Sequence, residues 1–535
     1  MKFKGFTKLL QYSVAVVVIG VATVIPVAVA GTQVSSPVIV ATSADLTQGM
    51  LANSQPDAPL SSYTVAGTRY WIGSQWNYSG KITQSLMQGD IEHPFTSIAW
   101  TKETCNLSAA TGYCIDGPNT AFTKVVPGDV HSLWFVGLYQ PQPSDGGLLG
   151  IIHEEKVGTS SRNRIGLAWS ADNGNTWTYL GRILSAYGDP DGGNIQGAPY
   201  LVKDGFLYVY YTDLGDGTLP AGSNGLSVAR ANLSDVLTAA RAGSVGSNLW
   251  HKYYVGGFVE PGLGGRSTLL GPYGITHTQA VHSQYTGKYY VLLTVMAWGD
   301  SDSFVKLYES IDAINWTPTV TLADEAASNL RPDGGYQYCS IVDPEGRPNA
   351  EAGAYLNVYC VKDPLSATTP HVGVYRWWVD LSGTTQMYRQ STDYSAQQGP
   401  YWWYQSGHNS VIYDMTYEGF WHGTDRWSAI YGDAMHPAAD EIPVLKWVAP
   451  RAGTIRIEGT VRDADIGCGN GVNTSIVHNG TQIFAADIDN GDTVGRSIDT
   501  VRQVAAGDGI FFMVAARGTD YYCDSTRWDP SIRYQ

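Results

Sequence analysis

A recurring pair of strands is the feature that most restricts the fold of this chain. A polar strand leads through a glycine turn into a strand rich in aromatic residues. The second strand recurs as KDGFLYVYYTD (Lys203–Asp213), YTGKYYVLLTV (Tyr285–Val295) and EAGAYLNVYCV (Glu351–Val361). Short strands rich in β-branched and aromatic residues, broken by Gly, Asp and Asn, are typical of all-β proteins. The pattern therefore predicts an all-β chain built from a repeated sheet.

A further strand follows each of these copies, and the pattern occurs twice more. A fourth copy fits residues 129–172, and a degenerate fifth copy covers Tyr63–Val126. Four-stranded repeats at a period of about 55–75 residues favour a β-propeller, and the number of copies predicts five blades. A large jelly roll or a β-helix is the structural alternative. The one convincing helix is short and covers Ser234–Gly243.

The pattern changes near Thr392. Strands such as VLKWVAPRAGTIRIEGTV and VAAGDGIFFMVAARG are separated by Gly-Asp and Asn-Gly turns, which are typical of antiparallel hairpins. This segment resembles the jelly-roll accessory domains that follow catalytic domains in carbohydrate-active enzymes. We therefore expect an N-terminal linker at 31–62, a five-bladed β-propeller at 63–387 and a C-terminal β-sandwich at 388–535.

The first thirty residues are predicted to be a signal peptide. Lys2, Lys4 and Lys8 precede an apolar stretch that ends in Ala28-Val29-Ala30, a small-x-small cleavage pattern. An uncleaved membrane anchor is the alternative reading. No later run is long enough to span a membrane. The expected location is therefore extracellular or periplasmic.

The number of cysteines, six, is consistent with an exported protein. An even number of cysteines in an exported chain favours disulfides, and no spacing suggests a zinc site. Proximity along the chain predicts three pairs: Cys105–Cys114, Cys339–Cys360 and Cys468–Cys523.

The amino-acid composition restricts the kinds of molecule that the protein is expected to bind. The chain has 33 Lys and Arg against 48 Asp and Glu, a net charge of −15. Nucleic-acid binding depends largely on cations at phosphates, so this balance argues against a nucleic-acid partner and against an anionic membrane. Its 17 Trp and 34 Tyr suit stacking on sugar rings. The predicted partner is a polysaccharide or oligosaccharide, neutral or basic more than anionic. Oligomeric state stays open.

One motif supports the propeller. SADNGNTW (Ser170–Trp177) has the form Ser-x-Asp-x-Gly-x-Thr-Trp, the Asp-box of sialidases and related propellers, and SIDAINW (Ser310–Trp316) is a degraded copy. In this turn Asp caps the backbone, Gly supplies a positive φ and Trp packs between sheets. The motif is structural and does not imply sialidase activity.

With these repeats, the stretch GNIQGAPYLVKDGFLYVYYTD and the Asp-box, residues 63–387 resemble the five-bladed glycoside hydrolases that include glycoside hydrolase family 43. The resemblance implies the fold and a glycosidase activity. The chain lacks the Arg-Asp-Pro of family 43, the Trp-Met-Asn-Asp-Pro-Asn of invertases and the arginine triad of sialidases. Catalytic residues must therefore be argued from geometry.

In a propeller the innermost strands line a central funnel, and residues i and i+2 of a strand share a face. Paired polar or aromatic residues occur on each expected inner strand, including Asp129 with His131 and Tyr336 with Tyr338. Polar propeller walls filled with water are the structural alternative. The predicted substrate-binding residues are His131, His153, Asn194, Gln196, Asp213, His277, Gln279 and Tyr338.

Three carboxylates are the predicted catalytic candidates. Asp129 begins an inner strand and is suited to activate water or attack an anomeric carbon. Glu155 shares a face with His153, while Glu154 is expected to point away, so Glu155 is the candidate general acid. Glu260 lies in a Gly-rich loop between blades. A turn cap, a solvated strand end and an exposed loop residue are the respective structural alternatives.

Other side chains carry weaker signals. No cofactor is required. Asp189 and Asp191 suit either a bare turn or a structural calcium site, because calcium prefers oxygen ligands. Further candidates are the carboxylates Asp90 and Glu92 with His93, the possible carboxylate-binding Arg230, and the possible sugar platforms Trp76 and Trp134.

Three functions follow from these observations. The first is a secreted glycoside hydrolase that uses a carboxylate acid/base pair in the funnel. The second is a polysaccharide lyase with a His or Tyr base, for which His131, His153, His277 and Tyr338 are candidates. The third is a non-catalytic glycan-binding surface protein. The sequence does not specify the sugar, the linkage, endo or exo action, or the stereochemical outcome.

Overall fold

A computed structural model describes most of the chain beyond its first thirty residues. The described residues are 31–42, 54–77, 82–94, 96–126, 129–142, 144, 146–155, 163–188, 194–213, 225–271, 277–295, 304–324, 335–363 and 373–535. The predicted signal peptide lies outside them. No helix in these ranges is long and apolar enough to cross a membrane.

The all-β prediction is confirmed. Apart from the helices α2 (Leu233–Arg241) and α3 (Gln390–Asp393), the regular elements of the described residues are strands. Helix α2 matches the one helix expected from the sequence. The Asn232 side chain caps it by accepting hydrogen bonds from the backbone N–H groups of Ser234 and Asp235.

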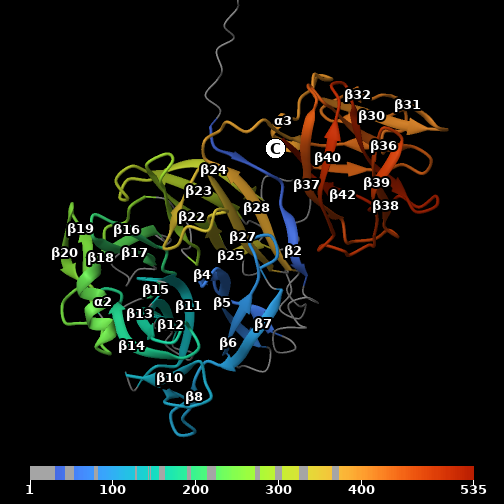
Figure 1. Cartoon of the computed structure of the whole chain (residues 1–535). Helices are drawn as coiled ribbons and strands as arrows, with labels where there is room; N and C mark the ends of the chain where they lie inside the picture. The colour runs from blue at the N-terminus through green and yellow to red at the C-terminus, as the bar shows by residue number, and fades with distance from the viewer. Residues whose placement is uncertain are drawn as a thin grey trace, which may run out of the picture.

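Residues 33–380 form five separate, largely antiparallel sheets, which fill the lower part of Figure 1. Sheet 1 contains β3 (Ser54–Pro56), β4 (Ser61–Val65), β5 (Thr68–Asn77), β6 (Ile82–Gln88) and β7 (Ser97–Glu103). Sheet 2 contains β10 (Phe122–Val125), β11 (Ser132–Tyr139), β12 (Leu148–Glu155), β13 (Arg164–Ser170) and β14 (Trp177–Leu184). Sheet 3 contains β15 (Ile195–Gln196), β16 (Tyr200–Lys203), β17 (Phe206–Asp213), β18 (Gly225–Asn232), β19 (His251–Tyr254) and β20 (Gly257–Pro261).

Sheet 4 contains β21 (Ala280–Ser283), β22 (Lys288–Val295), β23 (Phe304–Ser310), β24 (Thr317–Asp324) and β26 (Glu351–Ala352). Sheet 5 contains β25 (Gly335–Val342), β27 (Tyr355–Asp363), β28 (Gly373–Asp380) and the N-terminal strands β1 (Gln33–Val34) and β2 (Val38–Thr42). The short hairpin of β8 (Asn106–Leu107) and β9 (Cys114–Ile115) stands apart.

The five sheets pack against one another in a closed cycle. Separate apolar clusters join sheet 1 to sheet 2, sheet 2 to sheet 3, sheet 3 to sheet 4, and sheet 4 to sheet 5. A fifth cluster, which includes Trp71 of sheet 1 and Tyr359 of sheet 5, closes the cycle. The aromatic-rich strands that repeat in the sequence supply much of this packing, because a flat ring fills the space between two facing sheets.

The predicted N-terminal linker is wrong. Strands β1 and β2 form the outer edge of sheet 5 by pairing antiparallel with β28, and β3 pairs with β5 in sheet 1. Residues near both ends of the 33–380 segment therefore share one sheet. The sequence hid this arrangement because these strands are short and the partner of β2 lies more than 300 residues away, beyond the reach of any local pattern.

The C-terminal unit consists of two sheets around one core. The first contains β29 (Met387–Arg389), β32 (Thr416–Tyr417), β33 (Trp421–His422), β34 (Ala429–Ile430), β35 (Ala434–His436), β37 (Gly453–Asp463), β40 (Arg496–Val504), β42 (Thr526–Trp528) and β43 (Ser531–Tyr534). The second contains β30 (Trp402–His408), β31 (Val411–Asp414), β36 (Ile442–Val448), β38 (Val472–His478), β39 (Thr481–Ile488) and β41 (Gly509–Ala516). Trp447 and Trp528 lie in the shared core.

Ion pairs join this unit to the five sheets. Arg376 of β28 is 3% exposed and contacts Glu458 at 3.3 Å and Asp499 at 2.8 Å. Glu92 of the N-terminal half contacts Arg456 at 2.9 Å. Figure 1 shows β2, in blue, between β28 and the C-terminal unit.

All three predicted disulfides are present: Cys105–Cys114, Cys339–Cys360 and Cys468–Cys523. The two motif turns have similar hydrogen bonds. Asp172 accepts from the backbone N–H of Thr176, and Asp312 accepts from those of Ile314 and Asn315.

Candidate functional site

A carboxylate lies where sheets 1, 2 and 5 meet. Asp57 follows β3, and its two oxygens accept hydrogen bonds from different sheets. The Tyr338 hydroxyl donates to Oδ1 at 2.7 Å, and Trp134 Nε1 donates to Oδ2 at 3.1 Å. Both donors are uncharged, and a hydrogen bond donated to a carboxylate favours its ionised form.

The backbone at Tyr338 is unusual. Its φ is +52°, and the pairing of β25 with β27 is interrupted between Gln337 and Ser340. A positive φ is rare for a bulky residue and occurs mainly where the surrounding structure imposes it, often at functional sites. Here the irregular backbone accompanies the approach of the Tyr338 hydroxyl to Asp57.

Two histidines complete a continuous group of side chains. The ring centroids of Trp134 and His153 are 5.8 Å apart, those of His153 and His277 are 5.1 Å apart, and His277 stacks on Tyr338 at 5.8 Å. We call Asp57, Trp134, His153, His277 and Tyr338 the Asp57 cluster. It draws on sheets 1, 2, 4 and 5.

Both histidines of the cluster are neutral at pH 7. Burial lowers the pKa of His277 to about 4. Burial, assisted by the neighbouring His277, lowers the pKa of His153 well below its usual range. A neutral imidazole offers one donor and one acceptor nitrogen. The cluster therefore combines two neutral imidazoles with the Asp57 carboxyl group.

Glu155 lies next to this cluster on β12. In an antiparallel pair, residues directly opposite each other share a face. Ser132 is opposite Glu155 and Trp134 is opposite His153, so Glu155 is on the Trp134 face of sheet 2. Burial raises the pKa of the Glu155 carboxyl, which favours its protonated form. The predicted shared face of His153 and Glu155 is thus present.

Asp129 is not on that face. It forms an ion pair with Arg182 at 2.8 Å, and the same guanidinium contacts the buried Glu154 at 2.7 Å. Glu154 lies opposite Leu133, on the other side of sheet 2 from His153. The assignment of Asp129 to the catalytic pair is therefore corrected.

His131 is corrected for the same reason. Its ring contacts Tyr113 of the hairpin closed by the Cys105–Cys114 disulfide, with a centroid distance of 4.5 Å. The expected face of this strand held residues 129 and 131, whereas the structure places Ser132 and Trp134 with the cluster. A shift of one residue along a strand exchanges its two faces.

Glu260 is also outside the site. The segment that was expected to be a loop forms strand β20. This strand is at one edge of sheet 3, and β15 is at the opposite edge. Glu260 Oε2 accepts a hydrogen bond from the backbone N–H of Arg266 at 3.2 Å. Sheet 3 has two strands, β19 and β20, beyond the expected repeat, and they carry Glu260 to its rim.

The four remaining predicted residues divide into two groups. Asn194, Gln196 and Asp213 lie at or beside β15 in sheet 3. Gln196 is opposite Thr212, whereas Asp213 is opposite Ile195, so Gln196 and Asp213 face opposite sides. Asn194 Oδ1 accepts from the backbone N–H of Asn163 at 2.9 Å, which makes it a loop brace.

Gln279 is a brace between three sheets. Its amide nitrogen donates to the Leu60 carbonyl at 2.9 Å, and its amide oxygen accepts from the Ile341 N–H at 2.9 Å. These bonds occupy both ends of the side chain, which corrects its assignment as a substrate-binding residue. Gln279 lines a cavity whose lining does not include Asp57.

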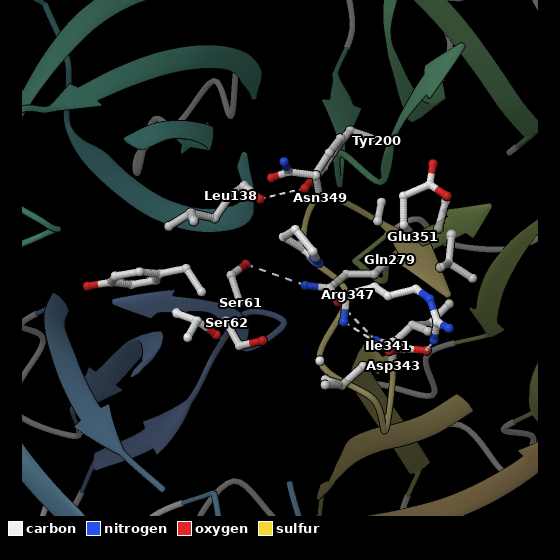
Figure 2. A pocket seen from close by; sticks show the side chains of 18 of the residues that line it. Ser61, Ser62, Leu138, Tyr200, Gln279, Ile341, Asp343, Arg347, Asn349 and Glu351 are labelled. Carbon is white, nitrogen blue, oxygen red and sulfur yellow. Dashed lines mark hydrogen bonds and ion pairs between the residues drawn. The ribbon is translucent and has the colours of Figure 1, made fainter. Parts of the chain in front are cut away.

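This cavity, shown in Figure 2, has a volume of about 50 Å³. Its lining continues from the cluster residues along the same strands, for example Leu138 after Trp134 on β11 and Ile341 after Tyr338 on β25. Asn349 crosses it by bonding the backbone of Gln140. The space suits a few water molecules and is too small for a sugar ring.

Several weaker candidates have structural roles. Asp90 accepts from the His93 backbone N–H at 2.6 Å, and Glu92 belongs to the ion pairs with the C-terminal unit. Arg230 donates to the Tyr208 hydroxyl at 2.8 Å and stacks on Phe258.

The calcium prediction remains untested. Asp189 and Asp191 lie outside the described residues, as does the Trp76 side chain. Within the described ranges, no group of three or more His, Cys, Asp or Glu side chains is arranged to hold a metal ion.

The sequence reasoning missed Asp57. The residue lies in QPDAPL (Gln55–Leu60), inside the segment expected to be a linker. The signal that could have found it is the location of Asp57 just before the short strand β4, which matches the location of His277 just before β21.

No protein-family model and no curated protein matches the chain. Solved structures to which the chain is similar include an exo-β-1,3-galactanase from Phanerochaete chrysosporium with β-1,3-galactotriose, at 11% identity and a TM-score of 0.44, covering 94% of this chain and 100% of that one. An α-L-arabinofuranosidase from Podospora anserina with cellotriose has 9% identity and a TM-score of 0.37, covering 60% and 90%. A GH43_1 enzyme from Xanthomonas citri with xylose has 12% identity and a TM-score of 0.34, covering 63% and 91%.

Proposed function

We infer that the five sheets are the blades of a five-bladed β-propeller and that the C-terminal unit is a jelly-roll β-sandwich. The closed cycle of apolar clusters between successive sheets supports the first inference. The shared core between two sheets supports the second. In this fold β4, β11, β16, β21 and β25 are the strands nearest the axis.

We propose that the protein is a secreted glycoside hydrolase. The observation that carries this proposal is the Asp57 carboxylate, whose two oxygens accept hydrogen bonds from the neutral donors Trp134 and Tyr338. Glycosidic cleavage needs an ionised carboxylate and a protonated one. Asp57 suits the first role. Glu155 suits the second, because burial raises the pKa of its carboxyl.

The proposed chemistry divides between the two groups. Glu155 protonates the glycosidic oxygen as the bond to the anomeric carbon breaks. Asp57 either attacks that carbon, giving retention, or removes a proton from an attacking water, giving inversion. Trp134 and Tyr338 hold the Asp57 carboxylate in one orientation for this step.

The second candidate, a lyase, is less well supported. A lyase acting on a uronic acid needs a cation beside the substrate carboxylate. The nearby Arg182 is on the far side of sheet 2 and is bound to Glu154 and Asp129. A non-catalytic glycan-binding protein remains the alternative that experiment must separate from the hydrolase.

We propose that the C-terminal unit holds the glycan chain. Trp427 is 56% exposed and Tyr522 is 63% exposed. Tyr521 stacks on Tyr522 at 4.8 Å and lies 6.4 Å from Trp427. Exposed aromatic faces suit the apolar face of a pyranose. Replacement of Trp427 and Tyr522 by Ala should weaken binding to insoluble polysaccharide and leave hydrolysis of short oligosaccharides unchanged.

The three disulfides are consistent with an oxidising, extracellular location. Expression of the full chain in a secreting host, with detection of the processed protein in the medium, tests export. Retention of the first thirty residues in the membrane fraction would instead support an anchor.

The test of activity is mass spectrometry of products from a panel of plant, algal and bacterial polysaccharides. Saturated oligosaccharides should be formed by the wild type and lost in Asp57→Asn and Glu155→Gln. Asp129→Asn is the matched control and should stay active, because Asp129 faces Arg182. Unsaturated products would identify a lyase, and binding without turnover would identify a glycan-binding protein.

A further inference from the structure

Two buried histidines in the Asp57 cluster have ring nitrogens without hydrogen-bond partners. Within the described residues, both nitrogens of His277 and Nδ1 of His153 are shielded from solvent and unpartnered. Buried polar atoms in native proteins nearly always have a partner, so three such atoms at one place need an explanation. They lie beside Trp134 and Tyr338, the two residues that donate to Asp57, and this location points to a ligand or ordered water.

The two rings are held rigidly. His277 lies between His153 and Tyr338, edge-on to the first at 5.1 Å and stacked on the second at 5.8 Å. His153 itself is 5% exposed and opposite Trp134 on the neighbouring strand. A ligand that enters the cluster therefore meets imidazole nitrogens at fixed positions rather than mobile side chains.

The chemistry of these nitrogens favours hydroxyl groups. Each ring is neutral and presents one donor and one acceptor. A sugar hydroxyl also donates and accepts, so a hydroxyl satisfies either kind of nitrogen. Of the nearby cations, Arg182 is bound to Glu154 and Lys362 packs against the Tyr336 ring.

We propose that His277 and His153 are specificity-determining residues that bind hydroxyl groups of the sugar unit placed against Asp57. This proposal rests on the proposed glycoside hydrolase function and adds the residues that select the sugar. A site that pairs its buried polar atoms with a substrate hydroxyl rejects an analogue without that hydroxyl, because the polar atoms are then left unpaired.

The test compares three variants. His277→Phe keeps the flat ring and removes both nitrogens, and His277→Gln restores one donor and one acceptor. His131→Phe is the matched control, because His131 contacts Tyr113 on the other face of sheet 2. Substrates are p-nitrophenyl glycosides of galactose, glucose, xylose and arabinose with their monodeoxy counterparts. In parallel, calorimetry measures the binding of the free sugars to EDTA-treated protein.

For the best sugar, His277→Phe should lower kcat/KM by about tenfold to a hundredfold, mostly through KM, and His277→Gln should recover part of the loss. The preference of the wild type for that sugar over one of its deoxy forms should disappear in His277→Phe. His131→Phe should behave as the wild type.

The outcomes separate the two proposals. An active wild type whose deoxy-sugar preference survives in His277→Phe overturns the role of His277 and leaves the hydrolase intact. Sugar binding that is lost in His277→Phe, without turnover by the wild type, supports the histidine site and overturns the hydrolase. Absence of both binding and turnover overturns both proposals.

Discussion

Replacing Tyr338 by Phe tests whether Asp57 acts as the ionised carboxylate. The substitution keeps the ring that stacks on His277 and removes the hydroxyl that donates to Asp57 Oδ1 at 2.7 Å. The other oxygen keeps its bond from Trp134 at 3.1 Å. The variant therefore removes a donor to the carboxylate without emptying the space around it.

The magnitude follows from the strength of that bond. A hydrogen bond to a charged group contributes about 1.5–3 kcal/mol. One pH unit corresponds to about 1.4 kcal/mol of difference between the two protonation states. The donor favours the anion, so its loss favours the protonated form. The acidic limb of the kcat/KM profile should therefore move by about 1–2 units to higher pH, and activity should fall most below neutral pH.

The assay is the pH dependence of kcat/KM on an oligosaccharide that the wild type cleaves, with thermal unfolding as a check on the fold. Tyr336→Phe is the matched control. Tyr336 lies two residues earlier on β25 and packs against Trp377 between sheets 4 and 5, so its profile should match that of the wild type. An acidic limb that is the same in wild type and Tyr338→Phe would refute the role of Asp57 as the ionised group.

Three further predictions concern stability. Arg376→Met leaves the Glu458 carboxylate, which is 1% exposed, without one of its cationic partners. The substitution should lower the free energy of unfolding by about 2–4 kcal/mol in denaturant titrations. An unchanged midpoint would contradict a structural role for the pair. Removing the Cys468–Cys523 disulfide, which joins residues 55 apart, should cost about 4 kcal/mol in the same assay, and an effect below 1 kcal/mol would contradict this. Burial raises the pKa of Asp524 to about 6, above its unfolded value of 3.8, so the folded state binds the proton more tightly and stability should fall by up to about 3 kcal/mol between pH 4 and 7. Asp524→Asn should flatten that part of the stability curve, and a curve identical to the wild type would refute the assignment.

Local sequence patterns determined the elements of this protein. Alternating apolar and polar residues with Gly-rich turns were enough to predict an all-β chain. Other local patterns predicted the short helix near Ser234 and the change in pattern near Thr392. They also placed His153 and Glu155 on one face of β12, because alternation within a single strand depends only on that strand. The cysteine pairs followed from proximity along the chain, and the structure has all three.

Tertiary structure decided which faces meet. Asp57 and Tyr338 are 281 residues apart, and Asp57 and Trp134 are 77 apart, so no local pattern connects them. Pairing with β12 sets which face of β11 lies toward the cluster, and a shift of one residue would exchange the two faces. In the observed register Trp134 is on the cluster face, whereas Asp129 and His131 are not. The candidate site exists because the five sheets close into a cycle, and closure is a property of packing between sheets.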